Sequence, residues 1–172
     1  MSNLNGKQLV EQGIITNVKN PNCIQQVGVD LELIKIEQVV GSGFVPKEGK
    51  TQLAARMEII PQEQPDGKSL WFLEPGVYDI TLAQGCKIPA DQRMRIVQRS
   101  SFLRNGAILS SSMFDPGFKT ENMGTILHVK IPMIIEVGAR VGQAYTTNVN
   151  EVDANDLYDG QWQGDKQRQE VQ

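Results

Sequence analysis

Short runs of alternating apolar and polar residues dominate the chain beyond its first 25 residues. In the clearest run, VDLELIKI, apolar and polar residues alternate from Val29 to Ile36, as in a strand with one buried face. Further apolar or alternating runs follow at short spacing, separated by Gly, Pro, Asn and Asp: RMEIIP, SLWFLEPG, GVYDITLAQGCKIP, QRMRIVQRS, AILSSSMF, GTILHVKIPMIIEVG and GQAYTTNV. Eight or more such strands predict an all-β sandwich or barrel of the jelly-roll type.

Two segments depart from this strand pattern. Residues 5–12 predict a short N-terminal helix with Asn5 as its N-cap and Gly13 as its stop. From Asp153 onward the chain is polar and rich in Gln, which is typical of a flexible or partner-ordered segment. We therefore predict a β-barrel domain over residues 1–152 and a C-terminal tail over residues 153–172.

Composition excludes several classes of protein. The 172 residues carry a net charge of −3, so no basic field is available to hold nucleic acid. No apolar run has membrane-spanning length, and the N-terminus lacks a signal-peptide pattern, so we expect no membrane partner. Cys23 and Cys86 have no metal-type spacing, which favours a reducing cytoplasm. His128 is the only histidine, which argues against a multi-histidine metal site.

The segment RSSFLRNG concentrates groups that suit a phosphate. Arg99 and Arg104 offer planar guanidinium forks, Ser100 and Ser101 add hydroxyl donors, and Gly106 allows a close backbone approach. The segment therefore predicts a phosphate grip. The alternative is a solvated loop after a strand.

The segment FDPGF places one acid in a tight turn. Pro116 and Gly117 occupy the second and third turn positions, after Asp115. The carboxylate of Asp115 is suited to ordering a water, binding a sugar hydroxyl or acting as a general base, or else it only caps the turn. Phe118 either stacks on a ligand ring or packs inside the hairpin.

Five motifs in order resemble the superfamily of dCTP deaminases and trimeric dUTPases, and within it the dCTP-deaminase-like branch. The motifs are QQVGVDLEL (25–33), RSSFLRNG (99–106), FDPGF (114–118), EVGARVGQA (136–144) and YDGQWQG (158–164). The resemblance implies a distorted jelly-roll β-barrel, a homotrimer whose active sites are shared between chains, and a deoxyuridine or deoxycytidine triphosphate as substrate.

The resemblance also implies roles for individual residues. Gln143 joins the RSSFLRNG residues on the phosphates, and Asp30 supports the barrel. The hairpin backbone at 113–118, including Gly117, reads the base, and Phe118 packs below the deoxyribose. Trp162 and Gln163 close over the nucleotide from the tail, where Lys166 is a further candidate phosphate contact.

The resemblance leaves two chemistries to compare. Deaminases of this type carry a glutamate in the strand after the DPGF turn, and Val129 stands at that position; a slip of one residue would place His128 there instead. The first hypothesis is therefore a dUTP diphosphatase, with Asp115 activating water and with Mg²⁺ held through the substrate phosphates. A dCTP deaminase, a bifunctional enzyme and a catalytically inactive nucleotide-binding or regulatory protein remain as alternatives.

Overall fold

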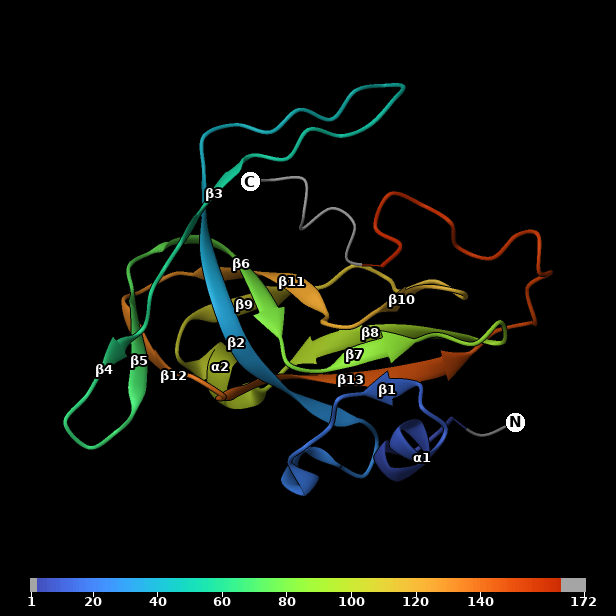
Figure 1. Cartoon of the computed structure of the whole chain (residues 1–172), viewed down its shortest axis with the longest axis horizontal. Coiled ribbons are helices and arrows are strands. Elements are labelled where there is room, and N and C mark those ends of the chain that lie inside the picture. The colour runs from blue at the N-terminus through green and yellow to red at the C-terminus, as the bar shows by residue number, and fades with distance from the viewer. Residues whose placement is uncertain (1–2, 165–172) are drawn as a thin grey trace.

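The computed structural model describes residues 3–164, and it confirms the predicted jelly-roll-type barrel. Within this range a seven-stranded antiparallel sheet runs in the order β8-β13-β2-β6-β11-β9, with β3 added to β2 (Figure 1). Its strands are β2 (Val29–Val40), β3 (Ala55–Glu58), β6 (Gly76–Leu82), β8 (Gln92–Gln98), β9 (Ala107–Ser110), β11 (Gly124–Val129) and β13 (Arg140–Asn148).

Two three-stranded sheets, in the orders β1-β7-β10 and β12-β5-β4, complete the described part of the barrel. Their strands are β1 (Ile15–Thr16), β4 (Gln62–Glu63), β5 (Ser69–Leu73), β7 (Gly85–Lys87), β10 (Lys119–Thr120) and β12 (Met133–Glu136). The helical segments are α1 (Gly6–Glu11), the 3-10 turn η1 (Pro21–Cys23) and α2 (Ser100–Arg104). None of the helices between residues 3 and 164 is long and apolar enough to cross a membrane.

Helix α1 begins as the sequence predicts. The side chain of Asn5 accepts a hydrogen bond from the backbone of Gln8, and the side chain of Gln8 accepts one from the backbone of Asn5. This reciprocal pair satisfies two backbone donors that a helix start leaves unpaired. The chain leaves the helix at Gly13, whose φ of 68° lies in the left-handed region that glycine tolerates.

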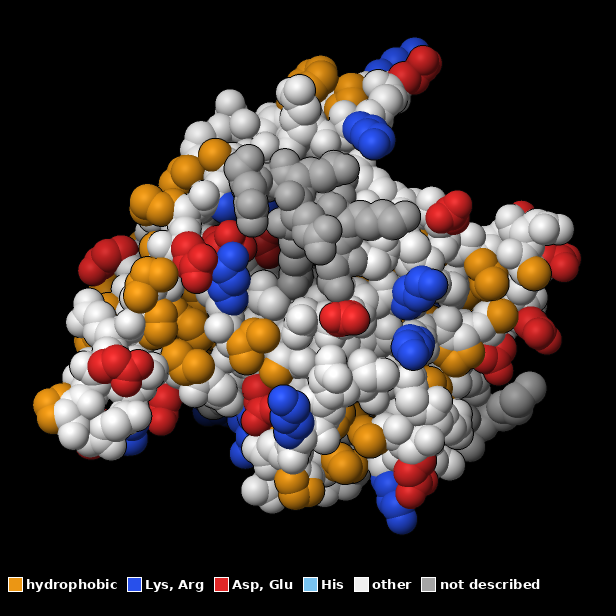
Figure 2. All heavy atoms as spheres, in the orientation of Figure 1, with side chains coloured by type: hydrophobic (Ala, Val, Ile, Leu, Met, Phe, Trp, Pro, Cys, Tyr) orange, Lys and Arg blue, Asp and Glu red, His pale blue; other side chains and the backbone are white. Residues whose placement is uncertain are grey.

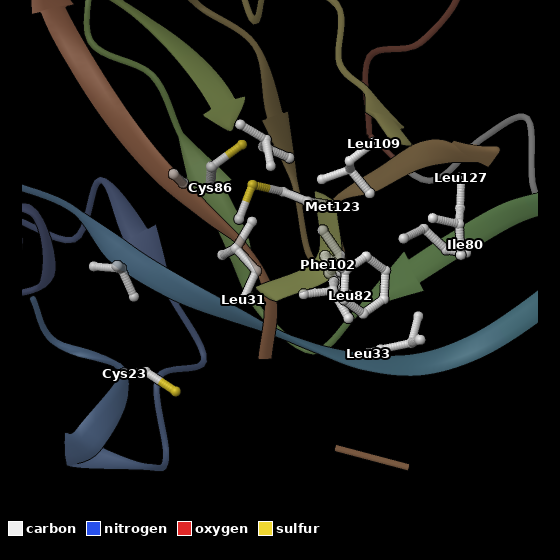
Figure 3. Close-up of a cluster of buried hydrophobic side chains, with 14 of the residues drawn as sticks. Cys23, Leu31, Leu33, Ile80, Leu82, Cys86, Phe102, Leu109, Met123 and Leu127 are labelled. Atoms are coloured by element: carbon white, nitrogen blue, oxygen red, sulfur yellow. The ribbon is translucent and has the colours of Figure 1, made fainter. Parts of the chain in front are cut away.

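Strand β2 runs through the centre of the sheet and supplies much of the core. Val29, Leu31 and Leu33 are fully buried, as the alternation predicts. A register shift between Leu33 and Lys35 then moves the buried position to Ile36. Figure 3 shows Leu31 and Leu33 among side chains from β6, β9, β11 and α2.

Both cysteines are free and buried in this core. Burial raises the pKa of Cys86 to about 12 and that of Cys23 to about 11. Both thiols therefore stay protonated at neutral pH and are poor nucleophiles, so they serve the packing of the barrel.

The large sheet stays open along one seam, between its edge strands β8 and β9. Side chains bridge this seam: Gln98 accepts a hydrogen bond from the backbone of Leu109 at 2.8 Å, and Ser111 accepts one from the backbone of Ile96 at 3.3 Å. An isolated backbone bridge joins Met94 to Phe114 farther along. The seam therefore fixes the FDPGF turn at one end of β8.

Candidate functional site

The RSSFLRNG segment is a short helix at the other end of β8, instead of the loop considered as the alternative. Arg99 is the N-cap of α2, and its backbone donates to Val141 on β13 at 3.1 Å. Phe102 points into the core and anchors the helix (Figure 3). Ser100, Ser101 and Arg104 remain exposed. The helix thus presents two hydroxyls and one guanidinium to the outside on a fixed backbone.

A tight approach behind α2 explains the glycine of the motif. Gly106 has a φ of 74°, and a Cβ there would lie 3.0 Å from the side chain of Ile131. A residue with a side chain would have to adopt a strained backbone against that neighbour. Gly106 therefore lets α2 turn directly into β9.

The strongest electrostatic feature of the site is a cluster around Asp30. The side chain of Asp30 is 4% exposed, and its Oδ2 lies 3.2 Å from Nη1 of Arg140 and 3.6 Å from Nε of Arg99. Its Oδ1 accepts a hydrogen bond from Nε2 of Gln143 at 3.2 Å. The cluster joins Arg99 and Gln143, two of the predicted phosphate contacts, through a buried carboxylate.

Sequence reasoning did not identify Arg140 as part of this cluster. Residues three apart on a regular strand point to opposite faces, so Arg140 and Gln143 would be separated. A register shift between Arg140 and Gly142 inserts one extra residue and turns Arg140 to the side of Gln143. The run GARVGQ carries no signal of this bulge beyond its glycines.

The FDPGF segment forms the predicted tight turn. The backbone of Phe118 donates to the carbonyl of Asp115 at 3.1 Å, and Gly117 has a φ of 88°. The carboxylate of Asp115 is exposed and forms no hydrogen bond or ion pair with residues 3–164. The backbone closes this turn, so a capping role does not account for the Asp115 side chain.

Phe118 packs inside the hairpin assembly. Its ring contacts Phe114 edge-on at a centroid distance of 5.4 Å and Tyr158 at 5.5 Å. The ring is half-buried, so one part packs on protein and the remainder is open. Packing inside the hairpin therefore leaves part of the Phe118 ring open for contact with a ligand.

The described part of the tail docks on this hairpin of its own chain. The amide of Gln163 donates to the carbonyls of Gly117 and Tyr158, each at 3.0 Å, and accepts from the backbone of Lys119 at 2.9 Å. These contacts use the Gln163 amide to anchor the tail. Trp162 is 46% exposed beside it, whereas Lys166 lies outside the described residues.

We expect Gln163→Ala to loosen this docking. Losing three hydrogen bonds, each worth about 1 kcal/mol, should speed hydrogen exchange at the Tyr158 and Lys119 amides about tenfold or more. The measurement is amide exchange followed by NMR. Gln161→Ala is the matched control, because its Nε2 has no partner among residues 3–164. Equal exchange in the two variants would show that Gln163 is not the anchor.

The strand proposed to face the base has a single continuous register. Strand β11 pairs with β6 from Gly124 to Val129 without a register shift, so alternate residues of the strand face the core. Val129 is 3% exposed and belongs to the core, whereas His128 is half-buried on the opposite face, opposite Val77 and Ile108. Val129 therefore faces the core of the barrel, and His128 points away from it.

One chain does not bring the acid and the phosphate grip together. Asp115 follows Phe114, which pairs with Met94, whereas Arg99 follows the far end of β8. At about 3.3 Å per residue, roughly 16 Å of strand separate Met94 from Arg99. A hollow of about 440 Å³ lies beside α2 and one of about 300 Å³ lies in the seam, and Asp115 lines neither.

The face drawn in Figure 2 carries no extended basic surface. On the face drawn in Figure 2, Lys and Arg side chains are scattered and alternate with Asp and Glu. Among residues 3–164, no group of three or more His, Cys, Asp or Glu side chains is placed to hold a metal ion. The Asp30 cluster differs from this pattern, because it brings the two guanidinium groups of Arg99 and Arg140 to one carboxylate.

Comparison with known proteins agrees with this architecture. The family described as "dCTP deaminase-like" matches residues 2–146. A protein of Aeropyrum pernix named "Probable deoxyuridine 5'-triphosphate nucleotidohydrolase" is 31% identical over 164 residues, which are 94% of this chain and 98% of that protein. The "Deoxyuridine 5'-triphosphate nucleotidohydrolase" of Methanocaldococcus jannaschii is 32% identical over 142 residues, which are 82% of this chain and 87% of that protein.

Among solved structures, the 2'-deoxycytidine 5'-triphosphate deaminase of Agrobacterium tumefaciens shares the fold, with a TM-score of 0.61 at 17% identity. The similarity covers 81% of this chain but only 45% of that deaminase chain. The matched family extends from α1 into β13 and so includes the Asp30 cluster and the FDPGF turn. The chain therefore belongs to the dCTP deaminase-like family.

Proposed function

We propose that this protein is a dUTP diphosphatase, which hydrolyses dUTP to dUMP and pyrophosphate. The names of its relatives support the substrate. The observation that favours hydrolysis over deamination is the position of Val129. A deaminase of this type needs a proton-transferring acid there, and a buried valine can neither donate nor accept a proton.

Asp115 is the residue that we assign to water activation. Its exposed carboxylate is free to accept a proton from a water that attacks the α-phosphorus. The bond from the α-phosphorus to the bridging oxygen of the β-phosphate breaks, and pyrophosphate leaves. Negative charge that develops on the phosphates is stabilised by the guanidinium groups of Arg99 and Arg104, the hydroxyls of Ser100 and Ser101, and the amide of Gln143.

The donor set fits Mg²⁺ carried by the substrate better than a metal held by the protein. Mg²⁺ commonly binds through one or two carboxylates together with substrate phosphates and water. The described residues offer Asp115 as an unpaired acid near the proposed reaction centre, without a cluster of acids around it. When bound, the ion would neutralise phosphate charge and orient the phosphates.

We propose a homotrimer in which neighbouring chains share each active site. The roughly 16 Å of strand between the hairpin and α2 means that one chain alone does not place Asp115 beside its own phosphate grip. Exposed apolar side chains near α2, namely Leu103, Ile131 and Ile134, offer a surface for a second copy. In this arrangement one chain supplies the hairpin and its neighbour supplies α2.

The tail from residue 153 is proposed to complete the site. Its anchoring through Gln163 holds Trp162 next to the hairpin that reads the nucleoside. The exposed indole of Trp162 is then available to cover a bound nucleotide. Phe118, between Tyr158 and Phe114, supports the deoxyribose from below.

Turnover of each deoxynucleoside triphosphate with Mg²⁺ tests the proposed activity. We expect loss of dUTP with equal amounts of dUMP and pyrophosphate, and much slower turnover of the other four. Products are resolved by ion-exchange chromatography, with ammonia measured in parallel. Release of ammonia from dCTP would favour the deaminase alternative, and binding of dUTP without product would favour a nucleotide-binding protein.

A further inference from the structure

We infer that Asp30 is a positioning residue for triphosphate binding, and that it acts through Arg99 and Gln143 without touching the substrate. This role rests on the proposed diphosphatase activity and deepens it. Asp30 lies on β2 directly opposite Gln143 on β13, and its carboxylate is almost fully buried. A buried carboxylate needs paired charges or hydrogen bonds, and this one has three cationic or amide partners.

The carboxylate sets which atoms of its partners face outward. An ionised carboxylate only accepts hydrogen bonds, so it selects the orientation of Gln143 in which the NH₂ group lies on its side. One N–H of that NH₂ group is used on Asp30, and its second N–H remains available to donate to a phosphate. In the opposite orientation, Gln143 would place its carbonyl oxygen there and repel a phosphate.

Arg99 is fixed in the same way. Its Nε faces Asp30 at 3.6 Å, and its Nη1 donates to the carbonyl of Arg140 at 3.3 Å. These two contacts use Nε and Nη1, and Nη2 forms no hydrogen bond with residues 3–164 on a side chain that is 35% exposed. Because the guanidinium is a rigid plane, fixing Nε and Nη1 also fixes the position of Nη2.

Arg140 neutralises the negative charge of Asp30, which would otherwise repel a phosphate bound nearby. Its Nη1 is shared between Oδ2 of Asp30 and the carbonyl of Asn22 at 2.8 Å. The positive charges of Arg99 and Arg140 together exceed the negative charge of Asp30. An approaching anion is therefore attracted to the hydrogen-bond donors of the cluster. Arg140 and Asp30 together therefore prepare the cluster before the substrate arrives.

Asp30→Asn tests this role in the full-length protein. Asparagine keeps the shape but loses the charge and presents an NH₂ group to the donors around it, so Gln143 and Arg99 should reorient. We expect KM for dUTP and the Kd for inorganic triphosphate with Mg²⁺ each to rise about tenfold or more, with a smaller change in kcat. Kinetics and isothermal titration calorimetry measure the two.

Glu32→Gln is the matched control. Glu32 is a half-buried acid on the same strand, and it holds Asn20 and Gln84 instead of the cationic cluster. We expect this variant to lower the unfolding temperature while leaving KM and the triphosphate Kd within twofold of wild type. If Glu32→Gln weakened triphosphate binding as much as Asp30→Asn, the role of Asp30 would be structural support alone.

Asp30→Glu tests the same role if Asp30→Asn does not fold. Asp30→Glu keeps the charge and moves the carboxylate by one methylene, so it should fold and still weaken inorganic triphosphate binding severalfold. Wild-type affinity in both Asp30 variants, or no binding of triphosphate by the wild type, would overturn the assignment. Triphosphate binding needs no turnover, so a failure of the dUTPase activity itself would be seen separately.

Discussion

We expect Asp115→Asn to lower kcat for dUTP about a thousandfold, because general-base catalysis typically contributes 10²- to 10⁴-fold and the amide cannot accept the proton. Binding should persist, since the turn is closed by the backbone carbonyl of Asp115 and its side chain forms no contact with residues 3–164. Release of pyrophosphate measures the rate, and titration with a non-hydrolysable imido analogue of dUTP measures the affinity.

Asp66→Asn is the control for a general effect of removing an exposed acid. Asp66 lies in a surface loop, where it accepts a hydrogen bond from the backbone of Lys68 at 3.2 Å and forms an exposed ion pair with the Lys68 ammonium at 3.7 Å. Its substitution should leave both kcat and KM unchanged. A rate for Asp115→Asn within a few fold of wild type would remove Asp115 from the chemistry, and a lost affinity would show that it binds the substrate instead.

Mixed trimers of Arg99→Ala and Asp115→Asn chains should recover activity that neither variant has alone. If each site takes Asp115 from one chain and Arg99 from its neighbour, some sites in a mixed ring contain both native residues. A closed ring of three that contains both kinds of chain has one such site, so about a third of the sites in the purified mixed trimers are complete. Co-expression with two different affinity tags, followed by sequential purification, supplies the mixed protein for the dUTP assay.

The control pair for this experiment places both changes on the same side of the site. Chains with Arg99→Ala and chains with Arg104→Ala each damage the α2 segment, so no mixture restores a complete phosphate grip. Recovery is therefore expected only for the first pair. Absence of recovery in the first pair, at confirmed mixed composition, would mean that the two residues serve a site within one chain.

Local sequence patterns were sufficient to predict several elements of the barrel. The alternation through β2, the capping residues of α1 and the Pro-Gly turn at 115–117 were all visible as residue types at fixed spacing. The five-residue helix at Ser100–Arg104 was not predicted. It is too short to show helical periodicity, and it is held by burial of Phe102 in a core made of distant strands.

The candidate site residues were predicted motif by motif. The sequence did not show which of them lie together in the fold. The sequence separates Asp30 from Arg99 and Arg140 by most of the barrel, and a β-bulge turns Arg140 toward them. The sequence alone also did not show which of His128 and Val129 faces the core. The continuous ladder between β11 and β6 places Val129 on the core face.

By itself, the sequence determined that this chain forms an all-β barrel with a cationic hydroxyl segment and a single acid in a tight turn. These features depend on residue types and spacing within a few positions, where steric and hydrogen-bonding preferences act locally. The tertiary structure decided that a buried carboxylate on β2 joins side chains from β13 and from the N-cap of α2, that Val129 faces the core, and that the described part of the tail rests on its own hairpin. Those outcomes depend on strand register and on burial between residues far apart in the chain, which no local pattern specifies.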